Sequence, residues 1–151
     1  MPYILSVITY VPLAAAFVLM FFPKAWTKHI KYVATGVFFA DFLLSLPLWF
    51  QWDQAQAAAD AAKSLWVFEE GPIPWITSLG VGYHFGVDGV SMLLVLLTTF
   101  LGVLAAWSGW KYIEKREKEY YIWLLILQTG MIGVFCSLVF FLFYVFWEVL
   151  L

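Results

Sequence analysis

Four long apolar runs make up more than half of the chain and carry only two charged side chains between them. They cover residues 4–22, 32–50, 90–110 and 120–151. A helix of about 20 apolar residues crosses the hydrocarbon core of a bilayer. The whole 151-residue chain is 64% hydrophobic and 12% charged, whereas a soluble domain is about 45–50% apolar and about 25% charged. The sequence therefore predicts an all-α membrane protein and argues against a water-soluble domain.

The last apolar run is too long for one membrane helix. Its 32 residues would extend about 48 Å at about 1.5 Å per residue, whereas the hydrocarbon core is about 30 Å thick. Cys136 and Ser137 are the weakly polar point nearest to the place where a break is needed, so we expect a turn at residues 137–139. We therefore predict a single membrane domain, residues 1–151, with about five transmembrane helices. They cover residues 4–22, 32–50, 90–110, 120–137 and 139–151, and the C-terminus truncates the last one.

Basic residues are distributed unevenly among the connecting segments. Seven of the eight Lys and Arg residues lie in the first and third connections, and Lys63 alone lies in residues 51–89. Cytoplasmic loops carry an excess of Lys and Arg. We therefore expect the N-terminus outside, with residues 51–89 as an extracytoplasmic loop. The seven basic residues are Lys24, Lys28, Lys31, Lys111, Lys115, Arg116 and Lys118.

The extracytoplasmic loop also contains signals for local structure. Residues 55–62 are rich in Ala, which favours a short surface helix or an extension of the second span. Residues 81–87 alternate Gly with aromatic and apolar residues, as a short strand or hairpin arm would. We expect four aromatic side chains of this loop to lie at the level of the lipid headgroups. They are Trp66, Trp75, Tyr83 and Phe85.

Glu148 is the first candidate for proton transfer. It lies about ten residues into the fifth predicted helix, which places it about 15 Å deep and near the bilayer centre. A carboxylate at that depth costs at least about 2.5–3.5 kcal/mol, and acids found there usually take part in ion or proton transfer. The alternative is that Glu148 lies near the end of a shortened helix or makes a structural hydrogen bond.

Asp41 is the second candidate for proton transfer. It is tenth in the 19-residue run 32–50 and is therefore also near mid-membrane. Two alternatives stay open for it. Its carboxyl group can pair with a neighbouring helix, or it can reach water beside a kink at Pro47.

Other residues of the apolar runs and their ends have predicted structural roles. Asp88 precedes the third helix and can cap its N-terminus. Gly130 and Gly133 allow another helix to approach closely. His84 and Asp88 together are too few for a metal site, so we expect none in this chain. The single cysteine, Cys136, excludes an internal disulfide and a multi-cysteine metal site.

Three segments in the second half of the chain resemble one family. They are YHFGVDGVSM at residues 83–92, GMIGVF at residues 130–135 and FLFYVFWEVL at residues 141–150. Their order and spacing are similar to those of an antiporter-like membrane subunit of respiratory complex I, the proton-pumping NADH–quinone oxidoreductase. This subunit is called M, or chain 4 in mitochondria. The resemblance runs from about Tyr83 to the end of the chain.

The resemblance implies that Glu148 is a proton-channel residue that pairs with a lysine on a later, broken helix. It implies that FMN, iron–sulfur clusters and quinone bind to other subunits, so that this chain holds no cofactor. The implied partners are the other membrane subunits of complex I, the lipid bilayer and protons, and the net charge of −2 gives no sign of nucleic acid. The implied location is the bacterial inner membrane, ahead of the mitochondrial inner membrane or the thylakoid.

The sequence departs from the family at two points. Val139 stands where an acidic or polar residue is expected in the turn, and the later lysine of the family lies beyond Leu151. We therefore expect the chain to be a portion of a longer subunit, the product of a split gene or a truncated product. The alternative functions are a subunit of a multisubunit cation/proton antiporter or of a membrane-bound hydrogenase, and a non-catalytic membrane scaffold or assembly protein.

Overall fold

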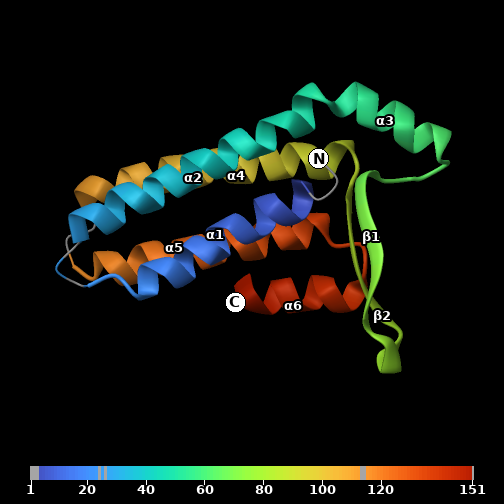
Figure 1. Cartoon of the computed structure of the whole chain (residues 1–151). Helices are drawn as coiled ribbons and strands as arrows, with labels where there is room; N and C mark the ends of the chain where they lie inside the picture. Colours follow the sequence, from blue (N-terminus) through green and yellow to red (C-terminus); the bar gives the residue numbers. More distant parts are fainter. Residues whose placement is uncertain (1–3, 24, 26, 113–114, 151) are drawn as a thin grey trace.

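In the described part of the chain, five apolar helices run roughly along one axis (Figure 1). The computed structural model describes residues 4–23, 25, 27–112 and 115–150, so Lys24 and Leu151 lie outside the described residues. The helices are α1 (Ile4–Met20), α2 (Thr27–Phe50), α4 (Gly89–Tyr112), α5 (Glu117–Cys136) and α6 (Phe140–Leu150). Of these, α2, α4 and α5 are long and apolar enough to cross a membrane, and α1 and α6 are shorter apolar helices. The predicted all-α membrane fold is confirmed.

The break in the last apolar run lies where the sequence predicted it. α5 ends at Cys136 and α6 begins at Phe140, so residues 137–139 form the turn. By contrast, α2 begins at Thr27, five residues before the predicted start of the second span. Lys28 and Lys31 have good helix propensity, so the helix continues past the apolar run into the basic end of the bundle. The apolar run therefore marks the span, and the helix itself is longer.

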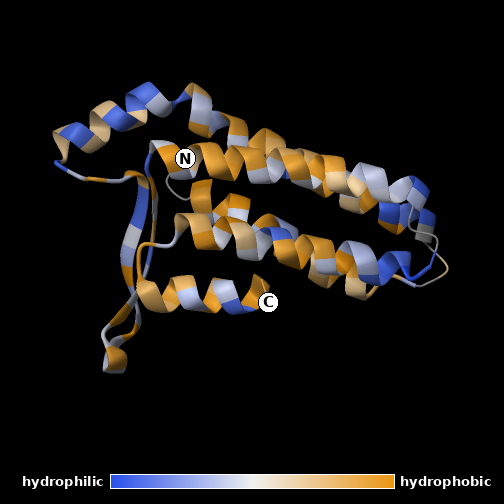
Figure 2. Cartoon of the chain, turned by 180° about the vertical axis from the view of Figure 1, so that it is seen from behind, coloured by the Kyte–Doolittle hydropathy of each residue, from blue (hydrophilic) through white to orange (hydrophobic). Residues whose placement is uncertain are grey.

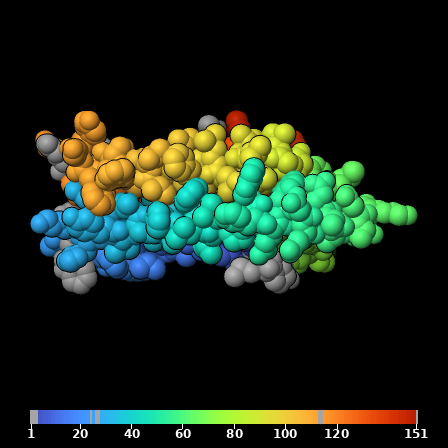
Figure 3. All heavy atoms as spheres, turned by 90° about the horizontal axis from the view of Figure 1, so that it is seen from above, coloured from blue at the N-terminus to red at the C-terminus, as the bar shows by residue number. Residues whose placement is uncertain are grey.

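The helices pack in two layers. α2 and α4 form one layer and lie side by side when the molecule is seen from above (Figure 3). α1 and α5 form the second layer, and α6 packs against α5 on the side away from the first layer (Figure 1). Polar contacts also hold α2 against α4. Among them, Trp110 Nε1 donates to Thr35 Oγ1 at 2.9 Å, and the Ser45 and Thr99 hydroxyl oxygens are 2.9 Å apart.

Residues 51–89 form a short helix and a β-hairpin at one end of the bundle (Figure 1). The elements are α3 (Trp52–Ala61), β1 (Val67–Ile76), the 3-10 helix η2 (Thr77–Leu79) and β2 (Val81–Val87). Hydrophilic residues gather on α3, whereas the apolar helices are mostly hydrophobic along their length (Figure 2). β1 pairs antiparallel with β2, and Ile73 lies opposite Tyr83. Gly71 has a φ of 98°, and a Cβ atom there would lie 2.4 Å from the Tyr83 carbonyl oxygen, so this position requires glycine.

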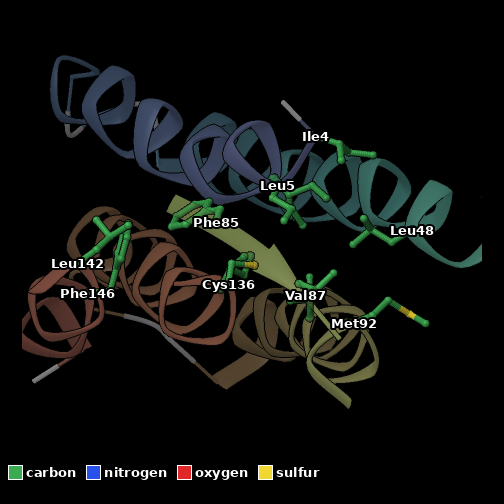
Figure 4. Packing of buried hydrophobic residues seen from close by; sticks show 12 residues of the cluster. Ile4, Leu5, Leu48, Phe85, Val87, Met92, Cys136, Leu142 and Phe146 are labelled. Atoms are coloured by element: carbon green, nitrogen blue, oxygen red, sulfur yellow. The ribbon is translucent and has the colours of Figure 1, made fainter. Parts of the chain in front are cut away.

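Apolar side chains from the helices and β2 meet in a core beside the hairpin (Figure 4). Phe85 of β2 is fully buried there, and its ring centroid lies 5.8 Å from that of Phe146 on α6. Phe85 therefore packs inside the protein and does not belong to a lipid-facing aromatic belt, and its level in the membrane stays a prediction. The Leu138 amide donates to the His84 carbonyl oxygen at 3.0 Å, which holds β2 against the turn between α5 and α6 and directs Phe85 into the bundle.

The first and third connections lie together at the end of the bundle opposite the hairpin (Figure 1). Lys118 Nζ donates to the carbonyl oxygens of Met20 at 2.9 Å and Phe22 at 2.7 Å, at the C-terminal end of α1. Lys31 Nζ donates to the Trp110 carbonyl oxygen at 3.3 Å, in the last turn of α4. The described basic residues of the two connections therefore share one end of the molecule, and the side of the membrane that this end faces stays a prediction.

Candidate functional site

Asp41 lies in the middle of α2, between the two helix layers. Its side chain is fully buried, and Gln128 Nε2 of α5 donates a hydrogen bond to its Oδ2 at 2.8 Å. Gln128 is 1% exposed. Of the two alternatives for this residue, the structure shows the contact with a neighbouring helix, so the carboxyl group joins α2 of one layer to α5 of the other.

Gly102 of α4 gives Gln128 the space to reach Asp41. A Cβ atom at position 102 would lie 2.0 Å from Gln128 Oε1 and 2.9 Å from the Phe38 ring. Even an alanine there would force Gln128 to move, because real Cβ atoms do not approach other atoms so closely. The polar contact is therefore assembled by three helices.

Three buried side-chain oxygens on α2 and α5 have no hydrogen-bond partner among the described residues. They are Asp41 Oδ1, Gln128 Oε1 and Thr129 Oγ1. Buried polar groups are nearly always paired, and each one left unpaired costs about 1–3 kcal/mol. Thr129 lines a pocket on the α6 side of α5 with Leu142 and Phe146. The contact between α2 and α5 therefore contains two of these oxygens, Asp41 Oδ1 and Gln128 Oε1.

Glu148 lies on the opposite side of α5 from Asp41. It is the ninth residue of α6, and its side chain is exposed, whereas Leu142 and Phe146 of the same helix point into the bundle (Figure 4). Tyr144 precedes Glu148 by four residues, so both share the outward face, and the Tyr144 hydroxyl interacts with the Glu148 carboxyl group. In the described part of the chain, nothing from another helix covers this face.

The two candidate acids lie at about the same level along the bundle. A Cβ atom at Gly130 would lie 3.3 Å from the Leu150 amide nitrogen and 3.4 Å from the Phe146 carbonyl oxygen, so the last turn of α6 lies against Gly130. Gln128, which binds Asp41, is two residues away, or about 3 Å along the helix. Gly133 contacts the Phe146 ring directly, so small residues at both positions let α6 approach α5.

Glu70 forms a second buried polar cluster, at the hairpin end of the bundle. It is 2% exposed and accepts the backbone amides of Leu5 at 2.7 Å and Ser6 at 3.1 Å, at the first turn of α1. The Ser6 hydroxyl group also donates to Glu70 and lies 2.7 Å from the Tyr83 hydroxyl oxygen. Burial raises the pKa of Glu70, although the hydrogen bonds from Ser6 and Leu5 favour its charged form. Glu70 thus caps α1 from a strand more than 60 residues away in the sequence.

The remaining candidates lie at the start of α4 and on the hairpin. Asp88 Oδ1 accepts the Ser91 amide at 2.8 Å, which caps α4 and holds the pKa of Asp88 below its ordinary value. His84 Nε2 lies 2.6 Å from Glu69 Oε1. The described residues contain no group of three or more His, Cys, Asp or Glu side chains that could hold a metal ion.

Two residues of these clusters were not singled out by the sequence patterns. Glu70 follows Glu69 in the connection between the second and third spans, and no pattern distinguishes the two residues. The irregular register of β1 buries Glu70 and leaves Glu69 exposed. Gln128 lies within the apolar run 120–151 and was assigned no role from the sequence. The sequence could have indicated the contact between Gln128 and Asp41. A side-chain amide in a membrane helix usually hydrogen-bonds to a polar group on a neighbouring helix, and Asp41 has a similar predicted depth.

The fold and the buried carboxyl group define the class of the chain, an integral membrane protein with helices that can span the bilayer. No protein-family model matches the chain. NADH-quinone oxidoreductase subunit M of Rhodobacter capsulatus is 40% identical over 149 residues, which are 96% of this chain and 27% of that protein. NADH-ubiquinone oxidoreductase chain 4 of Arabidopsis thaliana is 34% identical over 137 residues, 91% of this chain and 26% of that protein. Subunit M of Escherichia coli K12 is 41% identical over 108 residues, 72% of this chain and 21% of that protein.

The chain belongs to the subunit M and chain 4 family of NADH–quinone oxidoreductases. It spans about a quarter of the length of these relatives, between 21% and 27%.

Proposed function

We propose that the chain is part of a membrane subunit of NADH–quinone oxidoreductase and contributes to a proton-translocation channel. The relatives carry the name of that enzyme complex, which supports the assignment. Proton transfer through this subunit is coupled to NADH oxidation and quinone reduction, and the redox groups, FMN and iron–sulfur clusters, bind to other subunits. The partners are the other membrane subunits, lipid and protons, and the location is the bacterial inner membrane.

The observation that carries the proposal is the position of Glu148. Its carboxyl group lies at mid-bundle depth on a face that is otherwise apolar and aromatic. A carboxylate left against lipid at that depth costs at least about 2.5–3.5 kcal/mol, and such acids face protein or a water path. The outward face of α6 is therefore covered by further protein in the assembled subunit, and Glu148 lies at that boundary.

The chemistry proposed for Glu148 depends on a cation that moves toward its carboxyl group and then withdraws from it. A cation next to the carboxyl group favours the carboxylate form, and withdrawal of the cation favours proton uptake. Tyr144 lies on the same face and offers a hydroxyl group that can donate to the carboxylate or accept from the acid. A switched pair of this kind takes up and releases one proton in each cycle.

The test is the substitution Glu148→Gln in the complete, assembled complex. Gln keeps the size and polarity of the side chain and cannot carry the proton. We expect proton pumping and the coupled quinone reduction to be almost abolished, while the complex still assembles. Glu119→Gln, which removes an exposed carboxylate at the basic end of the bundle, is the matched control and should leave both unchanged. A normal proton-to-electron ratio in Glu148→Gln would contradict the proposal and favour a scaffold role.

A further inference from the structure

Two buried oxygens between α2, α4 and α5 lack a hydrogen-bond donor. Gln128 uses Nε2 for Asp41 Oδ2, and this leaves Asp41 Oδ1 and Gln128 Oε1 without a partner among the described residues. Both side chains are at most 1% exposed, so bulk water does not reach them. Each of these two buried acceptors therefore needs a donor.

The surrounding side chains supply no cation that could be this donor. The ion pairs of the described residues lie at the two ends of the bundle, between Lys31 and Glu117, between Arg116 and Glu119, and between His84 and Glu69. Beside Gln128 Oε1, the described neighbours at Gly102 are the apolar Phe38 ring and the glycine itself. The hydroxyl pair of Ser45 and Thr99, one turn along α2, is engaged in its own hydrogen bonds to the backbone and to each other.

A bound water molecule does not fit as the donor, because the space beside Gly102 is already filled. The room that Gly102 leaves is already filled, since Gln128 Oε1 lies 2.0 Å and the Phe38 ring 2.9 Å from the position of a Cβ atom at 102. A water molecule needs a cavity of its own and two or more partners. A proton needs no cavity.

We propose that Asp41 and Gln128 form a proton-binding site inside the bundle, in which Asp41 carries the proton on Oδ1. An O–H bond forms at Oδ1 of the Asp41 carboxylate, and one O–H bond of the hydronium ion that delivers the proton breaks, so the products are a neutral carboxylic acid and a water molecule. The new O–H group donates toward Gln128 Oε1, and Gln128 Nε2 continues to donate to Oδ2, so the amide holds the acid at both oxygens. The site goes beyond the role proposed for Glu148, because it lies on the other side of α5 and binds its own proton.

The test is infrared spectroscopy of the complete complex, comparing wild type with Asp41→Asn in light and heavy water. We expect a C=O stretching band of a protonated carboxyl group at neutral pH that shifts in heavy water and is lost in Asp41→Asn. Ser45→Ala is the matched control, because it removes an interhelical hydrogen bond of the same helix without a titratable group, and it should keep the band. Absence of the band in wild type at neutral pH, or its persistence in Asp41→Asn, overturns the proposal.

Gln128→Leu tests the pair separately and serves if Asp41→Asn does not assemble. Loss of the Nε2 donor removes the hydrogen bond to the carbonyl oxygen of the acid, so the Asp41 band should move to higher frequency. An unchanged frequency would overturn the paired site. The infrared band reports protonation of Asp41 and does not depend on proton pumping. A normal proton-to-electron ratio in Glu148→Gln would therefore contradict the proposed function without contradicting the proton-binding site at Asp41.

Discussion

The Glu70 carboxylate accepts the backbone amide of Leu5 at 2.7 Å, across 65 positions of the sequence. The first amides of a helix have no partner within the helix, and a carboxylate at this end also interacts favourably with the helix dipole. Glu70 lies on β1, and β2 in turn binds the turn between α5 and α6. The hairpin is therefore attached both to the start of α1 and to the start of α6, the helix that carries Glu148.

Replacement of Glu70 should loosen the first turn of α1. In Glu70→Ala the amides of Leu5 and Ser6 lose their acceptor, at a cost of about 1–3 kcal/mol. Hydrogen exchange at these two amides should therefore become about 5- to 150-fold faster. The neighbouring Glu69→Ala is the control, because Glu69 is exposed and binds Ser64 and His84 instead. Equal exchange rates in Glu70→Ala and wild type would show that Glu70 does not cap α1.

The cap of α4 should depend on pH through Asp88. Its pKa lies below the ordinary value of 3.8 because the Ser91 amide binds the charged form. The stabilisation is therefore present above about pH 3.8 and is lost as the pH falls through the lowered pKa. Asp88→Ala should destabilise the start of α4 by about 0.5–2 kcal/mol, and Asp88→Asn by less, since Asn is also a good N-cap.

Exchange of the Ser91 amide as a function of pH measures this cap. Protection of that amide in wild type should fall at low pH, whereas in Asp88→Asn it should not change over the same range. A wild-type profile that matches the Asn variant would rule out a charged cap.

Contact between α5 and α6 should be sensitive to a single methyl group at Gly133. A Cβ atom there would lie 2.3 Å from the Phe146 ring, so Gly133→Ala forces α6 away from α5, at about 1–3 kcal/mol. Gly36→Ala is the control, because a Cβ atom at position 36 meets nothing within 4 Å. Thermal unfolding of the purified protein measures both. Adding Phe146→Leu to Gly133→Ala should recover part of the loss, and equal stability of the two alanine variants would contradict the close packing.

The orientation predicted from the basic residues can be tested with single cysteines. On a Cys136→Ser background, Lys115→Cys lies at the basic end and Leu79→Cys at the tip of the hairpin, and both positions are exposed. A membrane-impermeant thiol reagent should label position 115 from the cytoplasmic side and position 79 from the other side. Labelling of position 115 from outside would reverse the orientation.

The sequence predicted the helices well because their lengths follow from hydrophobicity. A turn at residues 137–139 could be placed, since a 32-residue apolar run cannot cross a bilayer once and stop. The strand at residues 81–87 was visible in its alternating pattern. These features depend on residues that are near one another in the sequence, where composition and periodicity carry the information.

The polar contacts could not be predicted because they join distant segments. That Glu70 is buried and Glu69 is not depends on irregular pairing between β1 and β2. That Gln128 reaches Asp41 depends on the missing side chain at Gly102, on a third helix. The side of α6 that faces outward depends on which neighbours take Leu142 and Phe146, so the exposure of Glu148 was also hidden. Each of these is decided by packing between elements.

The seven basic residues that bias the topology are not equivalent to one another. Lys118 and Lys31 each hold carbonyl oxygens at a helix end, whereas Lys115 is exposed. A count of positive charges gives every one of these residues the same weight. Removing Lys115 takes away one positive charge, whereas removing Lys118 also takes away the hydrogen bonds at the C-terminal end of α1. Exchange of the exposed Lys115 for Arg should therefore leave the helix ends unchanged. Lys118 and Lys31 are restricted to positions from which an ammonium group reaches the end of the same helix.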